Sequence, residues 1–424
     1  MKLKMDKLVK HLLSIHPMAW LIGALATALV EWSVGSVIAY SIGLSNGVPP
    51  VFGLSLIFGK PAQIPSVIVY VVVVYLIPMY VVARLLSGVA DKVMSRLPQL
   101  ASIIAYLVVL YAVIEIWGSL DDYRLMVLKL IGIGIILTVS LNLVNGWMGE
   151  FSVAHAGFMA IGAYISSIVM VWGFVNDDVF GPAVLPTSWA PYAFPFALII
   201  GGIAAAIGAL VVAIPSFRTR GDYLGIITLA FVFIVQGVIN NLNFIGGARG
   251  FMHMPPLSSL TWVFIWTLLA LFTIQRYVSS TLGKATSAVR DNESAAEVMT
   301  VDTRKVKMVA FLTNAFWAGI AGGLYAHMMG YINPGNFGIV MSVEVLAMLY
   351  LGGLNSITGS VVGAVFYRLL SEILRPLGLY KWVLIPVLLI LIMIYRPFGL
   401  LGFQEVKLPT FGRKKEVAHA ADTD

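Results

Sequence analysis

The chain has 424 residues, of which 59% are hydrophobic and 11% are charged, and its formal net charge is +7. A soluble globular protein carries about 25% charged residues, and no polar stretch here is long enough to form a soluble domain. The basic residues cluster at the ends of apolar segments, which argues against a nucleic-acid-binding face. The lack of cysteine excludes disulfides, thiolate metal sites and cysteine catalysis.

Apolar runs of about 20 residues, the length that crosses a bilayer core, recur along the whole chain. They predict an all-α fold, a polytopic transmembrane bundle of about 10–12 spans. The first run follows four N-terminal lysines and is longer than the core of a signal peptide, so we expect a retained span. The predicted spans are 18–43, 64–86, 101–118, 125–144, 153–172, 192–216, 222–242, 260–280, 309–332, 340–354, 356–370 and 377–396.

The segment 340–370 fits two arrangements, because only Asn355 separates its two apolar runs. It forms either two thin helices or a re-entrant pair buried in protein. The distribution of Lys and Arg favours twelve crossings with both termini in the cytoplasm. In that orientation the segments 87–100, 217–221 and 281–308 are also cytoplasmic.

A weak internal echo connects two turns of the chain. Gly149-Glu-Phe-Ser152 is followed by Gly162-Ala163, and Gly353-Leu-Asn-Ser356 is followed by Gly363-Ala364. Transporters built from two repeats often place Gly-interrupted helices in matching positions near the substrate path. The spacing from the serine to the next glycine differs, ten residues against seven, so the echo alone is a poor indication of a repeat.

No motif for ATP hydrolysis occurs in this sequence. A phosphate-binding loop needs GxxxxGK followed by Ser or Thr, but Lys60 is followed by Pro61 and Lys284 by Ala285. The sequence contains no HExxH motif either. We therefore expect no catalytic residues, no cofactor and no metal site in this chain.

Charged groups within spans usually mark an ion or proton pathway, and here they are scattered over different segments. Glu115 and Lys129 flank a short turn, which favours a surface pair, and Glu31 lies alone in the first span. Glu344, four residues into a short span, is either structural or lines a solute path.

Polar residues in 141–164 leave two interpretations open. Asn142, Asn145, Ser152 and His155 lie at helix ends or inside spans, where an unsatisfied polar group is costly. They either cap helices and join them by hydrogen bonds, or line a path for a polar solute. At 217–223, Arg218 and Arg220 either extend to the membrane surface beside a capping Asp222 or contact a cytoplasmic partner.

The polar loop 281–308 is predicted to contain short helices. Asn292 can cap a helix over 293–299, and Asp302 can cap the helix that enters the next span. Ala295 and Ala296 are small residues among charges, which suits insertion into a groove of another protein. The alternative is a solvated loop without a partner.

Six stretches resemble permease subunits of bacterial ATP-binding cassette importers for branched-chain amino acids, specifically the longer (M-type) subunit. They occur in family order and cover roughly residues 125–400. The stretches are SLNLVNGWMGEFSVAHAGFMAIGAY (140–164), FRTRGDYLGIITLAF (217–231), IGGARGF (245–251), LGKATSAVRDNESAAEVMTVDTRKVKMVAF (282–311), AGIAGGLYAHMMGYINP (318–334) and LGGLNSITGSVVGAVF (351–366).

The resemblance implies import of leucine, isoleucine and valine through the bacterial inner membrane. It implies a second homologous permease subunit, two cytoplasmic ATPases and a periplasmic substrate-binding protein as partners, with 284–300 as the coupling region. By the same resemblance, the ATPase contact would involve Arg290, Asp291, Glu293, Ala295 and Ala296. Our own candidates for the translocation path are Ser152, His155 and Ser356.

The similarity has limits along the chain. Residues 1–110 match the family poorly and are expected to form an N-terminal transmembrane extension, followed by the core permease domain (111–400) and a basic tail (401–424). Thr300 stands where the family usually turns with glycine, and IGGARGF replaces a form with proline and asparagine. Related permeases for urea or short amides, and an ion-coupled secondary transporter, remain the alternatives.

Overall fold

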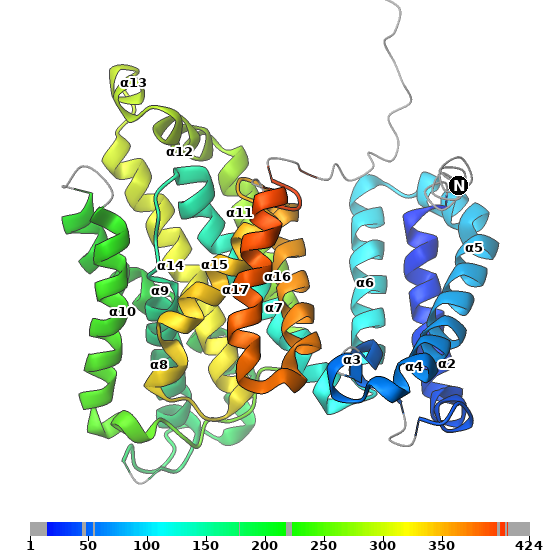
Figure 1. Ribbon diagram of the computed structural model, residues 1–424. Coiled ribbons are helices and arrows are strands. Elements are labelled where there is room, and N and C mark those ends of the chain that lie inside the picture. The colour runs from blue at the N-terminus through cyan, green and yellow to red at the C-terminus, as the bar shows by residue number, and fades with distance from the viewer. Residues whose placement is uncertain are drawn as a thin grey trace, which may run out of the picture. The chain divides into compact units, whose positions relative to one another are not determined.

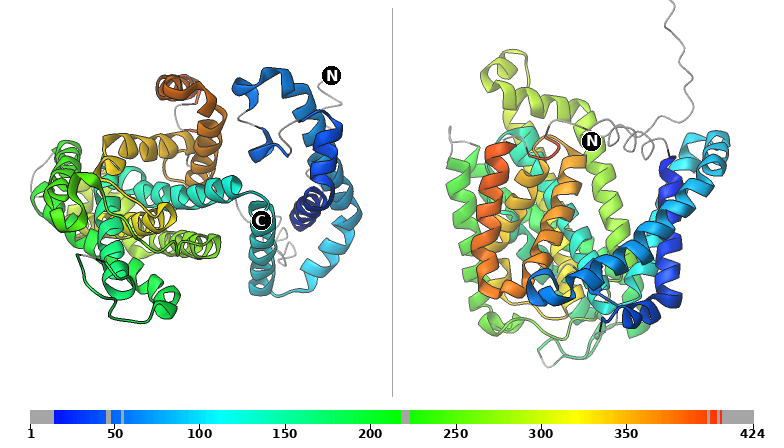
Figure 2. Two further views of the ribbon diagram at one scale, coloured as in Figure 1. Left: turned by 90° about the horizontal axis from the view of Figure 1, so that it is seen from below. Right: turned by 45° about the vertical axis from the view of Figure 1, so that its right-hand side comes forward.

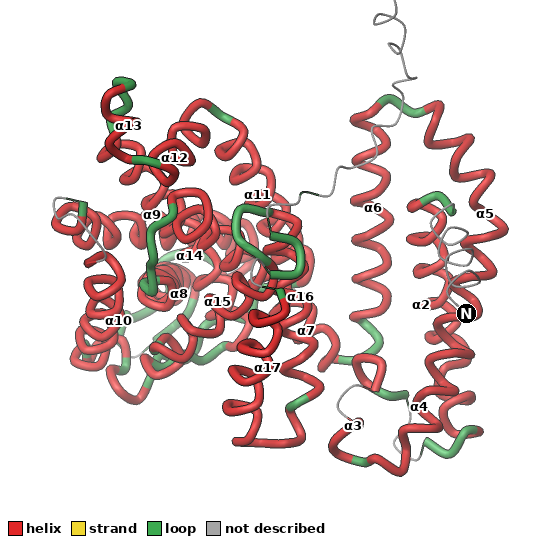
Figure 3. Tube along the Cα trace, turned by 45° about the horizontal axis from the view of Figure 1, so that its top comes forward, coloured by secondary structure: helices red, strands yellow, loops and turns green. Residues whose placement is uncertain are grey.

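The computed structural model describes residues 15–44, 48–53, 56–177, 179–217, 223–396, 399–402 and 405. Over these residues the regular elements are helices, with two isolated β-bridges (Figure 3). Helices satisfy every backbone polar group within one segment, as a lipid environment requires. The predicted all-α class is confirmed. The N-terminal lysines, Arg218, Arg220, Asp222 and most of the basic tail lie outside the described residues.

Eleven helical stretches of the described chain are long and apolar enough to cross a membrane, against twelve predicted segments. The difference comes from 356–370, which forms the shorter helix α16 of 17 residues. The helices are α2 (Pro17–Ser41), α3 (Leu56–Gly59), α4 (Ile64–Tyr70), α5 (Ile77–Arg96), α6 (Gln99–Gly118), α7 (Asp122–Asn142), α8 (His155–Phe174), α9 (Ala190–Ser216), α10 (Tyr223–Asn241), α11 (Leu260–Ser279), α12 (Thr281–Asp291), α13 (Glu293–Val298), α14 (Thr303–Met329), α15 (Ile339–Gly352), α16 (Ile357–Ile373) and α17 (Lys381–Tyr395).

Two π-helical segments and several 3-10 turns complete the set. The π-helices are η3 (Val71–Leu76) and η4 (Leu143–Met148). The 3-10 turns are η1 (Pro50–Gly53), η2 (Pro61–Gln63), η5 (Thr187–Trp189), η6 (Asn243–Ile245), η7 (Gly247–Arg249), η8 (Pro334–Phe337) and η9 (Arg375–Tyr380).

The chain forms two compact units. The first contains residues 1–128, 372–378 and 406–424, and the second contains 129–371 and 379–405. The boundary expected after residue 110 falls inside α6, which belongs wholly to the first unit. Helix α7 begins in the first unit and continues into the second.

A buried ion pair holds the first unit together. Arg124 and Glu31 make two hydrogen bonds, Nη2 to Oε1 at 2.8 Å and Nη1 to Oε2 at 3.0 Å, and both side chains are 1% exposed. Glu31, which appeared isolated in the sequence, therefore has a full partner. Breaking a buried pair of this kind typically costs about 3–5 kcal/mol, because one charge is left uncompensated.

The π-helix η3 completes the surroundings of Glu31. The Tyr75 hydroxyl lies 2.5 Å and the Tyr70 hydroxyl 3.3 Å from its two carboxylate oxygens. In a π-helix each N–H bonds five residues back, as Ile77 does to Val72, so residues five apart come close to the same face. This geometry lets Tyr70 and Tyr75 reach one carboxylate.

Close contact through small residues builds the core of the second unit. Helices α8, α9 and α14 run side by side (Figures 1 and 2). A Cβ atom on Gly162 would collide with the backbone of Gly319, and one on Gly322 would collide with the backbone of Met159. These small residues pack as their sequence predicts, since close backbone approach replaces the hydrophobic drive in lipid.

Helices α15 and α16 form a hairpin of two short helices. Gly363 lies against the backbone of Met348, and Gly352 lies against that of Gly359. At 1.5 Å per residue the two helices are about 21 and 26 Å long, shorter than the roughly 30 Å of a bilayer core. Between them the chain turns at Gly353 and Asn355, which have φ of 113° and 57°.

Candidate coupling loop and translocation path

Helix caps shape the polar loop that follows α11. The Ser280 hydroxyl accepts from the N–H of Gly283, the Asn292 side chain from that of Ala295 at 3.0 Å, and the Asp302 side chain from that of Lys305 at 3.0 Å. The predicted helix near 293–299 and the predicted cap at Asp302 are confirmed. Helices α12 and α13 extend beyond the end of the bundle in the second unit (Figure 1).

A small apolar core folds α13 back onto its neighbours. Ala296 is 5% exposed and packs with Val289 of α12 and Val306 of α14, whereas Ala295 is exposed. The expectation that both alanines face a partner therefore needs correction at Ala296. The helical rotation of about 100° between neighbouring residues turns its methyl group into the loop.

The exposed side of this loop carries two apolar residues that sequence reasoning missed. Val298 is 82% exposed and Met299 is 75% exposed, at the end of α13. Arg290 is half-buried, while Asp291, Glu293 and Ala295 are exposed around them. The signal was available, because apolar residues in a charged loop outside the spans have no lipid to contact. A polar surface with an apolar centre is typical of protein interfaces.

Two charged contacts connect the loop to the rest of the second unit. The Lys307 ammonium lies 2.7 Å from Glu150 and 2.9 Å from Glu293, and the Lys307 side chain is 12% exposed. Arg290 donates to the side-chain amide oxygen Oδ1 of Asn355 at 2.5 Å and pairs with Asp291 at 2.8 Å. The loop is thus held at the end of α12 and near the start of α14.

The three path candidates are fully buried in this conformation. Ser152, His155 and Ser356 are each at most 1% exposed. His155 Nε2 lies 3.0 Å from the Ser140 hydroxyl, and the Ser356 hydroxyl accepts from the Gly359 N–H at 2.9 Å. Of the two interpretations left open, this conformation realises capping and hydrogen bonding between helices.

Two asparagines near the end of α7 organise these residues. Asn145 accepts from the Ser152 N–H at 3.2 Å, and Asn142 donates to the Ser356 carbonyl at 3.0 Å. The structure therefore brings Ser152 and Ser356 to successive turns of one helical segment, α7 continued by η4. His155 lies three residues after Ser152, at the start of α8.

Glu344 has a partner in the neighbouring helix. The Arg368 guanidinium on α16 lies 3.6 Å from its carboxylate, and the two side chains are 14% and 18% exposed. The structure favours a structural pair, because each charge shields the other from lipid.

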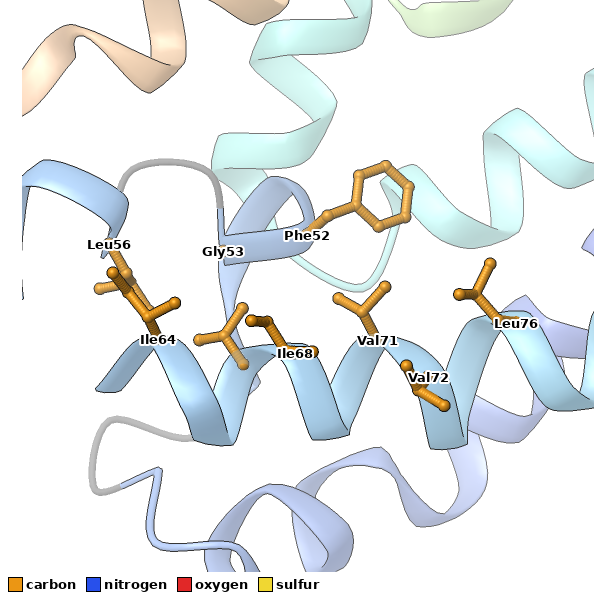
Figure 4. Close-up of a pocket in the computed structure, with 9 residues that line it drawn as sticks. Phe52, Gly53, Leu56, Ile64, Ile68, Val71, Val72 and Leu76 are labelled. Atoms are coloured by element: carbon orange, nitrogen blue, oxygen red, sulfur yellow. The ribbon is translucent and has the colours of Figure 1, made fainter. Parts of the chain in front are cut away.

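One pocket, of about 400 Å³, lies in the first unit. Its walls come from η1, α3, α4 and η3, with Phe52, Ile68, Val72 and Leu76 among the side chains (Figure 4). They are apolar, so the pocket offers no partner for the charges of an amino acid.

A known family model matches most of the second unit and a few residues of the first. The family model described as "Branched-chain amino acid transport system / permease component" matches residues 123–394, from the first turn of α7 to the end of α17. The chain belongs to this permease family. Helices α2 to α6 of the permease lie outside the matched residues.

Individual relatives agree with the family match. The permease is 30% identical to the high-affinity branched-chain amino acid transport system permease protein LivM of Escherichia coli over 67% of this chain and 72% of that protein. It is 25% identical to a probable LivM of Methanocaldococcus jannaschii over 69% of this chain and 97% of the relative. LivH of Salmonella typhimurium is 25% identical over 64% and 92%. No solved structure matches the permease.

Proposed function

We propose that this chain is a permease subunit of an ATP-binding cassette importer that carries leucine, isoleucine and valine into the cytoplasm. Membership of the permease family and the named substrates of its relatives support the substrate class. The observation that carries the mechanism is the ordered α12–α13 loop, whose exposed face combines Ala295, Val298 and Met299.

Partners supply what the sequence lacks. Because the chain contains no GxxxxGK[ST] motif, two cytoplasmic ATPases would provide the energy. A second permease would form the other half of the path, as LivM and LivH occur as separate permease proteins among the relatives. A periplasmic binding protein would deliver the amino acid.

The orientation follows from the basic residues. With both termini and the 281–308 loop in the cytoplasm of a bacterial inner membrane, most Lys and Arg outside the spans face inwards. ATP-driven closure of the ATPases would then push on α12 and α13 and switch the spans between two arrangements. Ser152, His155 and Ser356 stay candidates for the path. They are buried and hydrogen-bonded here, and these hydrogen bonds can break in the other arrangement.

A single substitution tests the docking surface. Ala295→Arg places a long cation at the centre of the exposed face, and we expect loss of ATPase co-purification and of leucine uptake, with unchanged membrane insertion. Ala295→Ser is the matched control, because it keeps a small side chain, and it should retain both. Full uptake by the arginine variant would refute docking through this face.

Substrate choice is tested in the same reconstituted complex. Radiolabelled leucine and urea are offered in parallel to proteoliposomes containing all partners. Saturable leucine uptake without urea uptake supports the proposal, whereas the reverse result assigns the permease to the urea or short-amide type.

A further inference from the structure

We propose that the coupling loop (residues 281–308) moves two turns of the membrane domain in parallel, through two polar links, Arg290–Asn355 and Lys307–Glu150. The inference rests on the proposed function and assigns positioning roles to Asn355 and Glu150, which belong to neither the docking face nor the path candidates. One turn leads into α16 and the other into α8.

The first link runs from α12 into the start of α16. Arg290 of α12 bonds the side chain of Asn355, and the Asn355 backbone N–H donates to Asn142 at 3.1 Å. The Asn142 amide in turn donates to the Ser360 hydroxyl at 2.7 Å and the Ser356 carbonyl at 3.0 Å. A displacement of Arg290 therefore reaches the first turn of α16 through contacts between side chain and backbone.

The second link runs from α13 and α14 into the turn before α8. Lys307 bridges Glu293 of α13 and Glu150, and the Glu150 N–H donates to the carbonyl of Val144 at 3.1 Å. Two residues further, Ser152 is held by Asn145. The same turn also touches α12. Gly149, which has a φ of 75°, lies so close to the Arg290 side chain that an added Cβ atom would collide with it.

The two turns are alike in construction, which gives the internal echo a physical meaning. Gly149-Glu-Phe-Ser152 and Gly353-Leu-Asn-Ser356 each begin with a glycine at positive φ, 75° and 113°. Each ends with a serine that is 0% exposed, shortly before a helix begins. In each, the residue bonded to the coupling loop lies between the glycine and the serine.

Partial burial makes these links suited to transmit motion. The side chains of Arg290, Lys307 and Glu150 are 26%, 12% and 24% exposed. Charged hydrogen bonds shielded from water are stronger and better oriented than exposed surface pairs, which contribute little.

The test measures leucine transported per ATP hydrolysed in the complete reconstituted complex. Asn355→Gly keeps the backbone at a φ of 57° accessible and removes the acceptor for Arg290. Asn355→Asp keeps that acceptor, and Glu150→Gln removes the charge from the second link independently. We expect Asn355→Gly and Glu150→Gln each to lower the ratio at least about fivefold, the lower end of coupling between sites, with normal ATPase co-purification.

Two comparisons make the outcome decisive. Asn355→Asp and the exposed Lys305→Met on α14 should keep the wild-type ratio. Suppose that the wild-type complex transports leucine and that Asn355→Gly and Glu150→Gln both keep its ratio of leucine transported to ATP hydrolysed. The links are then only structural and this proposal is wrong. If the wild-type chain neither binds ATPases nor transports leucine, the proposed function fails instead. A link variant whose ATPase co-purification and leucine transport fall in equal proportion also contradicts the proposal.

Discussion

Thr300 shows how one residue can conflict with its own backbone. It has a φ of 65°, a left-handed conformation that is costly for a β-branched residue, and its N–H closes the turn onto the Glu297 carbonyl at 3.0 Å. The sequence already indicated a turn here, because Thr300 stands where the family it resembles usually turns with glycine. The structure adds that threonine adopts the same conformation and bears the strain.

Replacing Thr300 by glycine should therefore stabilise the coupling loop. Relief of the left-handed strain is worth about 1 kcal/mol, which corresponds to roughly fivefold slower hydrogen exchange of the amides at 297–301. Thr300→Ala is the control, because it removes the branched side chain but keeps a Cβ atom. Equal exchange rates in the glycine and alanine variants would show that no strain resides at this position.

Helix α14 shows how a stripe of small residues becomes a packing surface. Gly319 faces Ala205, Gly201 and Gly202 of α9, and Gly162 of α8 lies against it. Gly237 on α10 is also helical, but nothing lies within 4 Å of the Cβ that a substitution would add. Both glycines thus lie within apolar helices, but only Gly319 packs closely against another helix.

Alanine substitutions at these two glycines should have opposite effects on stability. Gly237→Ala should stabilise by up to about 1 kcal/mol through helix propensity. Gly319→Ala should destabilise by about 1–3 kcal/mol, because the added methyl group overpacks the contact between α9 and α14. Thermal unfolding in detergent measures both. A gain in melting temperature for Gly319→Ala would mean that the helices do not approach this closely.

At the scale of the whole molecule, the proposed mechanism requires that partner ATPases exert a force on the coupling loop. Vesicles containing this chain alone should accumulate no leucine under a proton or sodium gradient, and accumulation should appear when the partner proteins and ATP are added. The charged groups within the spans support this expectation, because Glu31 and Glu344 are each paired with an arginine. Accumulation by the chain alone would instead identify an ion-coupled secondary transporter.

Local features were predictable from the sequence because their causes lie within a few residues. Hydropathy over about 20 residues gave the spans, and the caps at Asn292 and Asp302 act on N–H groups three residues away. The glycine-containing turns that precede Ser152 and Ser356 were likewise visible in the sequence, because each spans only four residues.

Contacts between distant parts of the chain had to come from the tertiary structure. Arg290 and Asn355 are 65 residues apart, Lys307 and Glu150 are 157 apart, and Glu31 and Arg124 are 93 apart. Periodicity is uninformative about such pairs, because they depend on which helix faces are packed together. The same reason explains Ala296: its composition suits an exposed contact, but the packing of α13 on α12 and α14 turns it inwards.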